Sequence, residues 1–221
     1  MASNADPWAI APLTAVDLEG SGAQDREDEA ILEIAVVPLA ISLPDVGAAY
    51  TTLINPGRPI PRRPWISPGL TSAVLATAPD PADVEPELAR RINGRFIVGH
   101  NIGVDWRLLH RRYPQITPVG LIDTLRLARY LKLGTKNSLG TLIEAMALTP
   151  RVEELAPDSQ PHRALWDTIA TALLLAGLIN SGWPHGISLG ELLAVAGIDL
   201  LRPDDAAQQD SRNLAQNTLF D

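Results

Sequence analysis

The first 54 residues constrain the fold most strongly, because they hold three β-rich apolar segments joined by short connections. Residues 13–18 (LTAVDL), 31–39 (ILEIAVVPL) and 49–54 (AYTTLI) have the length and apolar content of strands. Glycines and charges fill the first connection, and an Asn-Pro-Gly turn at 55–57 ends the third segment. Strands joined this closely pair as neighbours, so we expect an antiparallel meander.

The rest of the chain adds helices and a further strand. A proline-rich stretch, RPIPRRPWISPGL, follows the meander and is incompatible with a regular helix or a central strand. Residues 95–99 (RFIVG) predict a short apolar strand. Helical patterns cover residues 82–93, 104–112, 121–132, 138–147, 163–180 and 188–196. We therefore expect an α/β fold, in which helices flank a mixed sheet made of the antiparallel meander plus parallel strands.

Composition excludes several classes of protein. The chain has no cysteine, which rules out disulfide scaffolds, Cys-ligated zinc, iron–sulfur clusters and thiol nucleophiles. Hydrophobic residues make up 46% and charged residues 20%, which is typical of a globular domain rather than a disordered chain. No secretory signal is visible, and no apolar run reaches the ~18 residues of a membrane span. We expect a soluble cytoplasmic protein that does not interact with membranes.

The net charge of −8 is unevenly distributed. Residues 58–136 hold 13 basic and 6 acidic side chains, whereas the segments on either side are acidic. This basic middle either forms a patch that faces phosphates or consists of solvated helix faces. The candidates for strand binding are Arg62, Arg63, Arg107, Arg111 and Arg112.

Two carboxylates stand in the first predicted strand. Asp17 and Glu19 are two residues apart, so the strand period places them on the same face of the sheet. Two unit charges ~4 Å apart repel by ~4 kcal/mol at an effective dielectric near 20. The pair therefore takes up a proton or a metal ion, unless Glu19 already lies in the turn and both groups are solvated.

Two further motifs carry acidic residues at helix starts. Asp105 follows the strand of residues 96–99 through a short loop, and Asp167 lies in the first turns of an apolar helix just after His162. Taken singly, an acidic residue in the first turn and a histidine before a helix are ordinary structural features. Their combination with Asp17 and Glu19 is more informative.

The ordered set Asp17-x-Glu19, His100-Asn101-x-x-x-Asp105 and His162-x-Ala164-x-x-Asp167 resembles the DEDDh branch of the DnaQ-like 3′–5′ exonucleases. Segments 31–35, 121–125 and 137–142 also match, and the resemblance covers about residues 12–180.

This resemblance implies a ribonuclease-H-like fold with two divalent metal ions, Mg²⁺ or Mn²⁺. The implied metal ligands are Asp17, Glu19, Asp105 and Asp167, with His162 as the general base. The implied contacts to the 3′ end of a single strand are Leu18, Gly20, His100 and Asn101.

The sequence departs from the family pattern at two places. Gly20-Ser21 stands where many relatives carry Thr-Thr or Thr-Gly, and Val104 replaces the usual Phe before Asp105. The first departure affects the backbone beside the terminal nucleotide and therefore substrate choice. A Rossmann-type nucleotide loop is excluded, because the glycine motif at 20–22 is incomplete and no helix is predicted after it.

We expect the protein to hydrolyse single-stranded nucleic acid from the 3′ end to 5′-mononucleotides, with DNA favoured. Two alternatives remain open. One is an exonuclease of RNA or of short oligoribonucleotides, because 2′-hydroxyl contacts leave no sequence signature here. The other is a non-catalytic nucleic-acid-binding module on the same fold, although all five expected catalytic positions are filled.

The predicted organisation is an N-terminal extension over 1–11, the exonuclease domain over 12–200 and a polar tail over 201–221. The tail ends with Gln216, Leu219 and Phe220, whose spacing resembles the peptides by which bacterial replication and repair proteins dock on the sliding clamp. Asn217 departs from that pattern. Either the tail binds a clamp, which favours a DNA-maintenance enzyme, or Leu219 and Phe220 pack on the protein's own surface.

Overall fold

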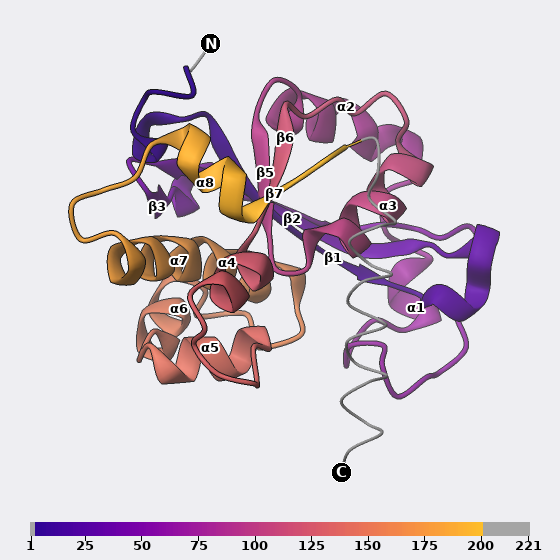
Figure 1. Ribbon diagram of the computed structural model, residues 1–221. Helices are drawn as coiled ribbons and strands as arrows, with labels where there is room; N and C mark the ends of the chain where they lie inside the picture. Colours follow the sequence, from indigo (N-terminus) through magenta and orange to yellow (C-terminus); the bar gives the residue numbers. More distant parts are fainter. Residues whose placement is uncertain (1–2, 201–221) are drawn as a thin grey trace.

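A computed structural model describes residues 3–200 (Figure 1). Its centre is a seven-stranded sheet in the order β3-β2-β1-β5-β6-β7, with β4 also paired to β2. The strands are β1 Leu13–Gly20, β2 Ile31–Ala40, β3 Leu43–Pro44, β4 Tyr50–Leu53, β5 Phe96–Gly99, β6 Gly120–Asp123 and β7 Gly197–Ile198. β2 is antiparallel to β1, β3 and β4, and β1, β5 and β6 run parallel. This confirms the expected mixed sheet.

Helices cover both faces of the sheet (Figure 1). They are α1 Ser72–Leu75, α2 Pro81–Ile92, α3 Ile102–Arg112, α4 Thr124–Tyr130, α5 Leu139–Ala145, α6 Thr149–Leu155, α7 Ala164–Gly182 and α8 Leu189–Ala196, with 3-10 turns η1 Trp8–Ile10, η2 Ala23–Asp28 and η3 Val46–Ala48. The apolar residues of α4–α8 form one core with one face of the sheet, and those of α2 and α3 form a second core on the other face.

The alternation of side chains along β1 decides which face carries the carboxylates. Leu13 and Ala15 belong to the core beneath α7, whereas Val16 belongs to the core beneath α3. Because successive side chains point to opposite faces, Asp17 and Glu19 continue the row of Leu13 and Ala15. Glu19 lies within the strand, so the alternative of a solvated turn residue is wrong.

One predicted helix begins too early. Residues 121–132 were expected to be helical throughout, but 120–123 form β6, and the helix α4 begins at Thr124. Periodicity does not distinguish a short apolar strand from a buried helical turn. Parallel pairing of Leu121 and Ile122 with β5 decides the matter, because it satisfies the backbone of both strands.

The N-terminal segment packs against the same core as α7 and α8. Trp8 is buried in the core beneath α7, and Pro7 bridges to Ser188 just before α8. Helix α7 is long and apolar enough to cross a membrane, but 72% of that window is buried inside the protein, as in a core helix. Residues 201–221, including Gln216, Leu219 and Phe220, lie outside the described residues.

Asp25 holds the proline-rich segment, residues 56–71, against the end of β1. Its carboxylate accepts hydrogen bonds from Ser21 Oγ at 2.7 Å and Arg58 Nη2 at 2.8 Å, and Arg63 Nη2 lies 2.7 Å away. These three partners hold the pKa of the Asp25 carboxyl far below its usual range. A segment without regular structure is thus fixed by side chains.

We expect Asp25→Asn to lower the free energy of unfolding at pH 7 by roughly 1–2 kcal/mol, because it removes a charge-assisted network. The folded-state pKa is depressed, so this stability is present above the unfolded pKa near ~3.9 and is lost as pH falls further. Urea unfolding from pH 7 to pH 3 measures it. The difference between variant and wild type should shrink in acid, and Asp28→Asn, an exposed neighbour, should have little effect.

Candidate active site

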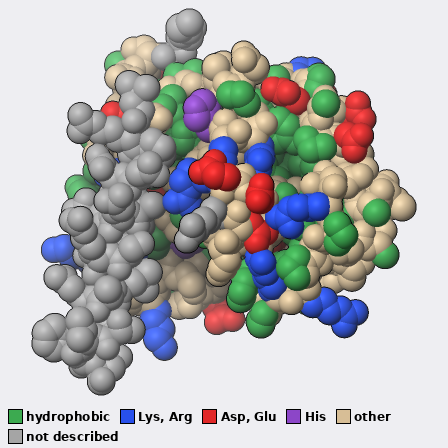
Figure 2. Space-filling model, turned by 90° about the vertical axis from the view of Figure 1, so that its right-hand side faces the viewer, with side chains coloured by type: hydrophobic (Ala, Val, Ile, Leu, Met, Phe, Trp, Pro, Cys, Tyr) green, Lys and Arg blue, Asp and Glu red, His purple; other side chains and the backbone are tan. Residues whose placement is uncertain are grey.

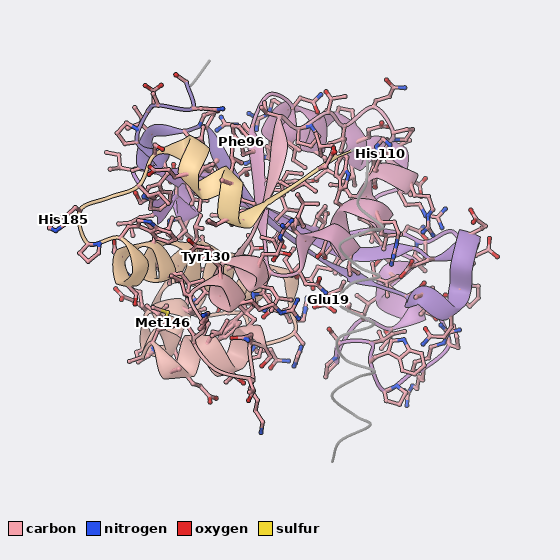
Figure 3. All side chains as sticks on the ribbon, in the orientation of Figure 1. Glu19, Phe96, His110, Tyr130, Met146 and His185 are labelled. Atoms are coloured by element: carbon pink, nitrogen blue, oxygen red, sulfur yellow. The ribbon has the colours of Figure 1, made fainter. Side chains whose placement is uncertain are left out.

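Three carboxylates converge at the end of β1. Asp17 and Glu19 come from β1 and Asp167 from the first turn of α7, and one oxygen of each lies within 4.8 Å of the others. All three side chains are half-buried. Glu19 lies beside the end of β1, whereas His110 and His185 lie at the periphery (Figure 3). The structure therefore brings together residues from two elements that are far apart in the sequence.

Asp105 stands on α3, which packs against the opposite face of the sheet, and its charge acts on Asp17 of the cluster. The pairing of β1 with β5 ends at Ala15 and Val98, so the strands no longer share hydrogen bonds beyond that point. The first turn of α3 follows β5, and the Leu18 backbone donates a hydrogen bond to the Asp105 carboxylate. Burial raises the pKa of Asp105 to about 8, and the negative charge of Asp105 helps to raise that of Asp17.

The carboxylates share an environment that disfavours their ionised forms. Burial and the neighbouring charges of Asp105 and Asp167 raise the pKa of Asp17 well above its ordinary value. Burial raises the pKa of Glu19 to about 7 and that of Asp167 to about 6, with nearby acids adding to both. The charges of Arg163 and His162 offset this only in part, for Glu19 and Asp167 respectively, and a bound cation would supply further positive charge.

His162 precedes α7 and is exposed. Its backbone has a φ of 65°, which is uncommon for a residue with a side chain. In this conformation its backbone N–H donates to the Asp167 carboxylate, and the imidazole lies close enough to lower the pKa of Asp167. The turn thus leaves the ring at the solvent side of the carboxylate cluster.

An ion pair that the sequence reasoning missed fixes the start of α7. Arg163 donates from Nε and Nη2 to the two oxygens of Glu33 at 2.8 and 2.7 Å, and the Ala164 N–H also donates to Glu33. Glu33 is buried on β2 and stands opposite Glu19 in the register of β1 and β2. The signal was present, because a charged residue within the apolar run 31–39 needs a buried partner.

A second missed residue contacts Glu19 directly. Ser67, buried in the proline-rich segment, donates from Oγ to Glu19 Oε2 at 2.7 Å. This hydrogen bond lowers the pKa of Glu19 and so works against the effect of burial. No local pattern around Ser67 predicts the contact, since the segment has no periodicity.

The residues predicted to contact substrate lie in the last part of β1, for Leu18 and Gly20, and directly after β5, for His100 and Asn101. His100 Nε2 lies 2.9 Å from the Asn137 carbonyl oxygen and therefore carries the proton, while Nδ1 lies 2.9 Å from Thr124 Oγ1. Burial lowers the pKa of His100 to about 4. The Asn101 N–H donates to Asp123 Oδ1 at 2.9 Å, and the register of β1 shifts at Gly20. Both histidine nitrogens are thus used within the protein.

The basic middle of the chain does not form one continuous patch. Arg63 pairs with Asp25, Arg111 lies 3.7 Å from Glu29, and Arg112 donates to the Glu27 and Glu29 carbonyls. Figure 2 views the molecule from the right-hand side of Figure 1. On the part of this face where side chains are coloured, acidic and basic side chains lie side by side.

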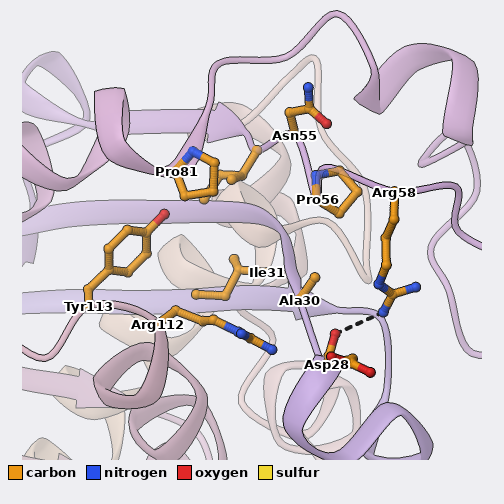
Figure 4. A pocket seen from close by; sticks show the side chains of 10 residues that line it. Asp28, Ala30, Ile31, Asn55, Pro56, Arg58, Pro81, Arg112 and Tyr113 are labelled. Carbon is orange, nitrogen blue, oxygen red and sulfur yellow. Dashed lines mark hydrogen bonds between the residues drawn. The ribbon is translucent and has the colours of Figure 1, made fainter.

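A hollow of about 230 Å³ lies between Asp28, Arg58 and Arg112. Arg58, whose Nη2 donates to the Asp28 carbonyl, and Arg112 contribute to its wall (Figure 4). None of the four clustered carboxylates lines it.

The residues of the cluster fit a divalent cation. Their donors are all carboxylate oxygens, which Mg²⁺ and Mn²⁺ prefer over the nitrogen and sulfur ligands typical of zinc. The three converging oxygens and the raised pKa values indicate a site that is incomplete without positive charge. The chemistry of the donor set thus agrees with a metal-binding site.

The family model described as Exonuclease (RNase_T) matches residues 14–175, which include all five predicted catalytic residues. The chain belongs to the DnaQ-like exonucleases. Exodeoxyribonuclease 10 of Escherichia coli K12 is 32% identical over 172 residues, which are 77% of this chain and 70% of that protein. This confirms the family and, with it, the ribonuclease-H-like character of the fold.

The share of a relative's length that the match covers differs between a further relative and a solved structure. A DNA polymerase III subunit epsilon-like protein of Rhodobacter capsulatus is 32% identical over 178 residues, covering 78% of this chain but 24% of that protein. The solved structure of exonuclease X in complex with 5′-overhanging duplex DNA is 29% identical, with a TM-score of 0.58, and covers 81% of this exonuclease chain and 98% of that one. The chain spans under a quarter of the length of the Rhodobacter capsulatus relative.

We expect Arg163→Ala to destabilise the exonuclease by roughly 2–3 kcal/mol, because it leaves the Glu33 carboxylate buried without its partner. This value lies below the roughly 3–5 kcal/mol expected for a fully buried pair, since the Arg163 side chain is 30% exposed. Adding Glu33→Gln to this variant should restore part of the loss, as measured by urea unfolding. Arg151→Ala, which breaks the exposed pair with Glu154, serves as the control and should change stability by less than ~0.5 kcal/mol.

Without metal, we expect stability to fall as pH rises from about 4 to 8. The folded-state pKa values of Glu19 and Asp167 are raised to about 7 and 6, so the folded state binds more protons than the unfolded state within this window. Saturating Mg²⁺ or Mn²⁺ should remove the fall and add about 2.7 kcal/mol at 100 times the dissociation constant. Thermal unfolding in EDTA and in metal measures both, and identical pH profiles would contradict the site.

Proposed function

We propose that this exonuclease hydrolyses single-stranded nucleic acid from the 3′ end in a metal-dependent reaction that releases 5′-mononucleotides. The observation that carries the proposal is the convergence of Asp17, Glu19 and Asp167 within 4.8 Å on a fold of this family. Asp105 completes the set from the other face of the sheet. The histidine before α7, His162, supports placing the chain in the DEDDh branch.

The four carboxylates would hold two divalent ions, Mg²⁺ or Mn²⁺. When bound, such ions stabilise charge on the attacking and leaving oxygens and lower the pKa of bound water. Hydrogen bonds within the protein hold these carboxylates in position: Ser67 Oγ donates to Glu19, the Leu18 backbone to Asp105 and the His162 backbone to Asp167.

His162 acts as the general base. In its neutral form one ring nitrogen accepts the proton that the attacking water loses. The water oxygen bonds to the terminal phosphorus, the bond from phosphorus to the 3′-oxygen breaks, and that oxygen takes up a proton. The exposed position of the ring, close to Asp167, supports this role, because the imidazole can exchange its proton with solvent after each turnover.

DNA is the favoured substrate, because the names of the relatives refer to deoxyribonuclease and DNA polymerase activities. The terminal nucleotide would be contacted by four residues: Leu18, Gly20, His100 and Asn101. A sliding clamp that receives Gln216, Leu219 and Phe220 would place the enzyme in DNA repair in the cytoplasm. RNA is the second candidate, since 2′-hydroxyl contacts leave no signature in this sequence.

The direct test uses a single-stranded oligonucleotide with a 5′ fluorophore and either a deoxy or a ribo 3′ end. Shortening in single-nucleotide steps with Mg²⁺ or Mn²⁺, abolished by EDTA, is expected. Activity that persists in excess EDTA, or degradation that starts at the 5′ end, would overturn the proposal. Full-length protein and a Leu219→Ala, Phe220→Ala variant, compared for binding to the host clamp, test the tail.

We expect Asp17→Asn and Asp167→Asn to reduce turnover by at least ~10³-fold, because each removes a ligand charge. His162→Ala should reduce kcat by ~10²–10⁴-fold but leave metal binding intact, since general-base catalysis contributes that much. Calorimetric titration with Mn²⁺ separates the two classes. His185→Ala, an exposed histidine far from Glu19, is the control and should keep wild-type activity (Figure 3).

A further inference from the structure

Trp65 is a large exposed aromatic side chain close to the carboxylate cluster. Its side chain lies in the proline-rich segment and is 51% exposed. Single exposed apolar residues are common on protein surfaces, so exposure alone carries no functional meaning. The surroundings of this indole, however, distinguish it from the other exposed apolar residues.

The structure holds the Trp65 ring in one orientation. Its Nε1–H donates to the Ser21 carbonyl at 3.4 Å, and the Arg63 guanidinium lies over the ring at 5.7 Å from its centroid. Arg63 is itself fixed by its ion pair with Asp25. These contacts fix the position of the exposed ring, so the ring is pre-organised before any ligand binds.

Gly22 makes room for the indole. Its φ of +105° favours glycine, and a Cβ at this position would lie 2.5 Å from Trp65 Nε1. A side chain at residue 22 would therefore displace the ring from the end of β1. The backbone at residue 22 thus accommodates a side chain that remains 51% exposed.

Two short stretches of chain connect the ring to Glu19 of the carboxylate cluster. Ser21, its backbone partner, is two residues beyond Glu19, a distance of about 7 Å along an extended chain. On the other side, Ser67 lies two residues after Trp65 and donates to Glu19 at 2.7 Å.

We infer that the Trp65 indole is a stacking platform for one nucleobase of the bound strand, next to the terminal nucleotide. This inference rests on the proposed function, because it names a substrate contact of the same site. Stacking on an aromatic face is available to every base, so the contact adds affinity without sequence preference. Arg63 lies over the ring and adds positive charge to the platform.

Two variants separate stacking from a structural role of the ring. Trp65→Phe and Trp65→Leu both lose the hydrogen bond to Ser21, but Phe alone keeps an aromatic face. We expect Trp65→Leu to weaken binding of a single-stranded 10-mer by roughly 5- to 100-fold, and Trp65→Phe to recover most of that loss. Binding is measured by fluorescence anisotropy with the full chain in EDTA, which prevents hydrolysis.

Abasic substitution identifies the base that stacks. A set of 10-mers, each lacking one base at a different distance from the 3′ end, should show one position where wild type loses affinity and Trp65→Leu loses nothing further. In steady-state hydrolysis the same variant should raise KM and change kcat by less than twofold.

Equal losses for Phe and Leu, or parallel abasic profiles for wild type and Leu, would overturn the inference and leave Trp65 a structural residue. These results are distinct from failure of the proposed function. A wild-type protein that binds strands through Trp65 but does not hydrolyse them would contradict the exonuclease reaction and retain the stacking site. A protein that hydrolyses strands with Trp65→Leu unchanged in affinity would do the reverse.

Discussion

Carboxylates of like charge crowd into one half-buried volume at the end of β1, and the surrounding structure is arranged around that constraint. Asp17, Glu19 and Asp167 approach within 4.8 Å, and burial raises the pKa of each. Such an arrangement is unfavourable alone, so the fold must hold it in place. It does so with hydrogen bonds to the carboxylates from Ser67 and from backbone N–H groups, while the nearest strong cation neutralises a different acid.

That acid is Glu33, and its pairing with Arg163 explains how a distant helix reaches the sheet. The guanidinium holds the first turn of α7 against β2, and Asp167 follows one turn later. Arg163 is paired with Glu33, and its charge lowers the pKa of Glu19 only in part, so that this pKa remains raised to about 7. The start of α7 therefore serves both stability and function. The ion pair orders the helix, and the neighbouring turn positions Asp167 and His162.

The proline-rich segment has a comparable double role. It contains no regular structure over most of its length, yet Asp25 fixes its arginines, Ser67 contacts Glu19, and Trp65 is held beside Ser21. Loops placed by a rigid scaffold are where binding residues concentrate, because they can present side chains without disturbing the core. Here the scaffold is the meander of β1, β2 and β4, and the segment covers its open end.

The sequence by itself determined the strand pattern of the first 54 residues, the shared face of Asp17 and Glu19, and the buried helix that carries Asp167. These are local properties, set by the two-residue period of a strand and the apolar content of a helix. Tertiary structure alone decided that residues 120–123 form a strand, that Glu33 pairs with Arg163, and that Ser67 reaches Glu19. Each of these depends on which segments the sheet order makes neighbours, and a distance across the fold has no signature in a local pattern.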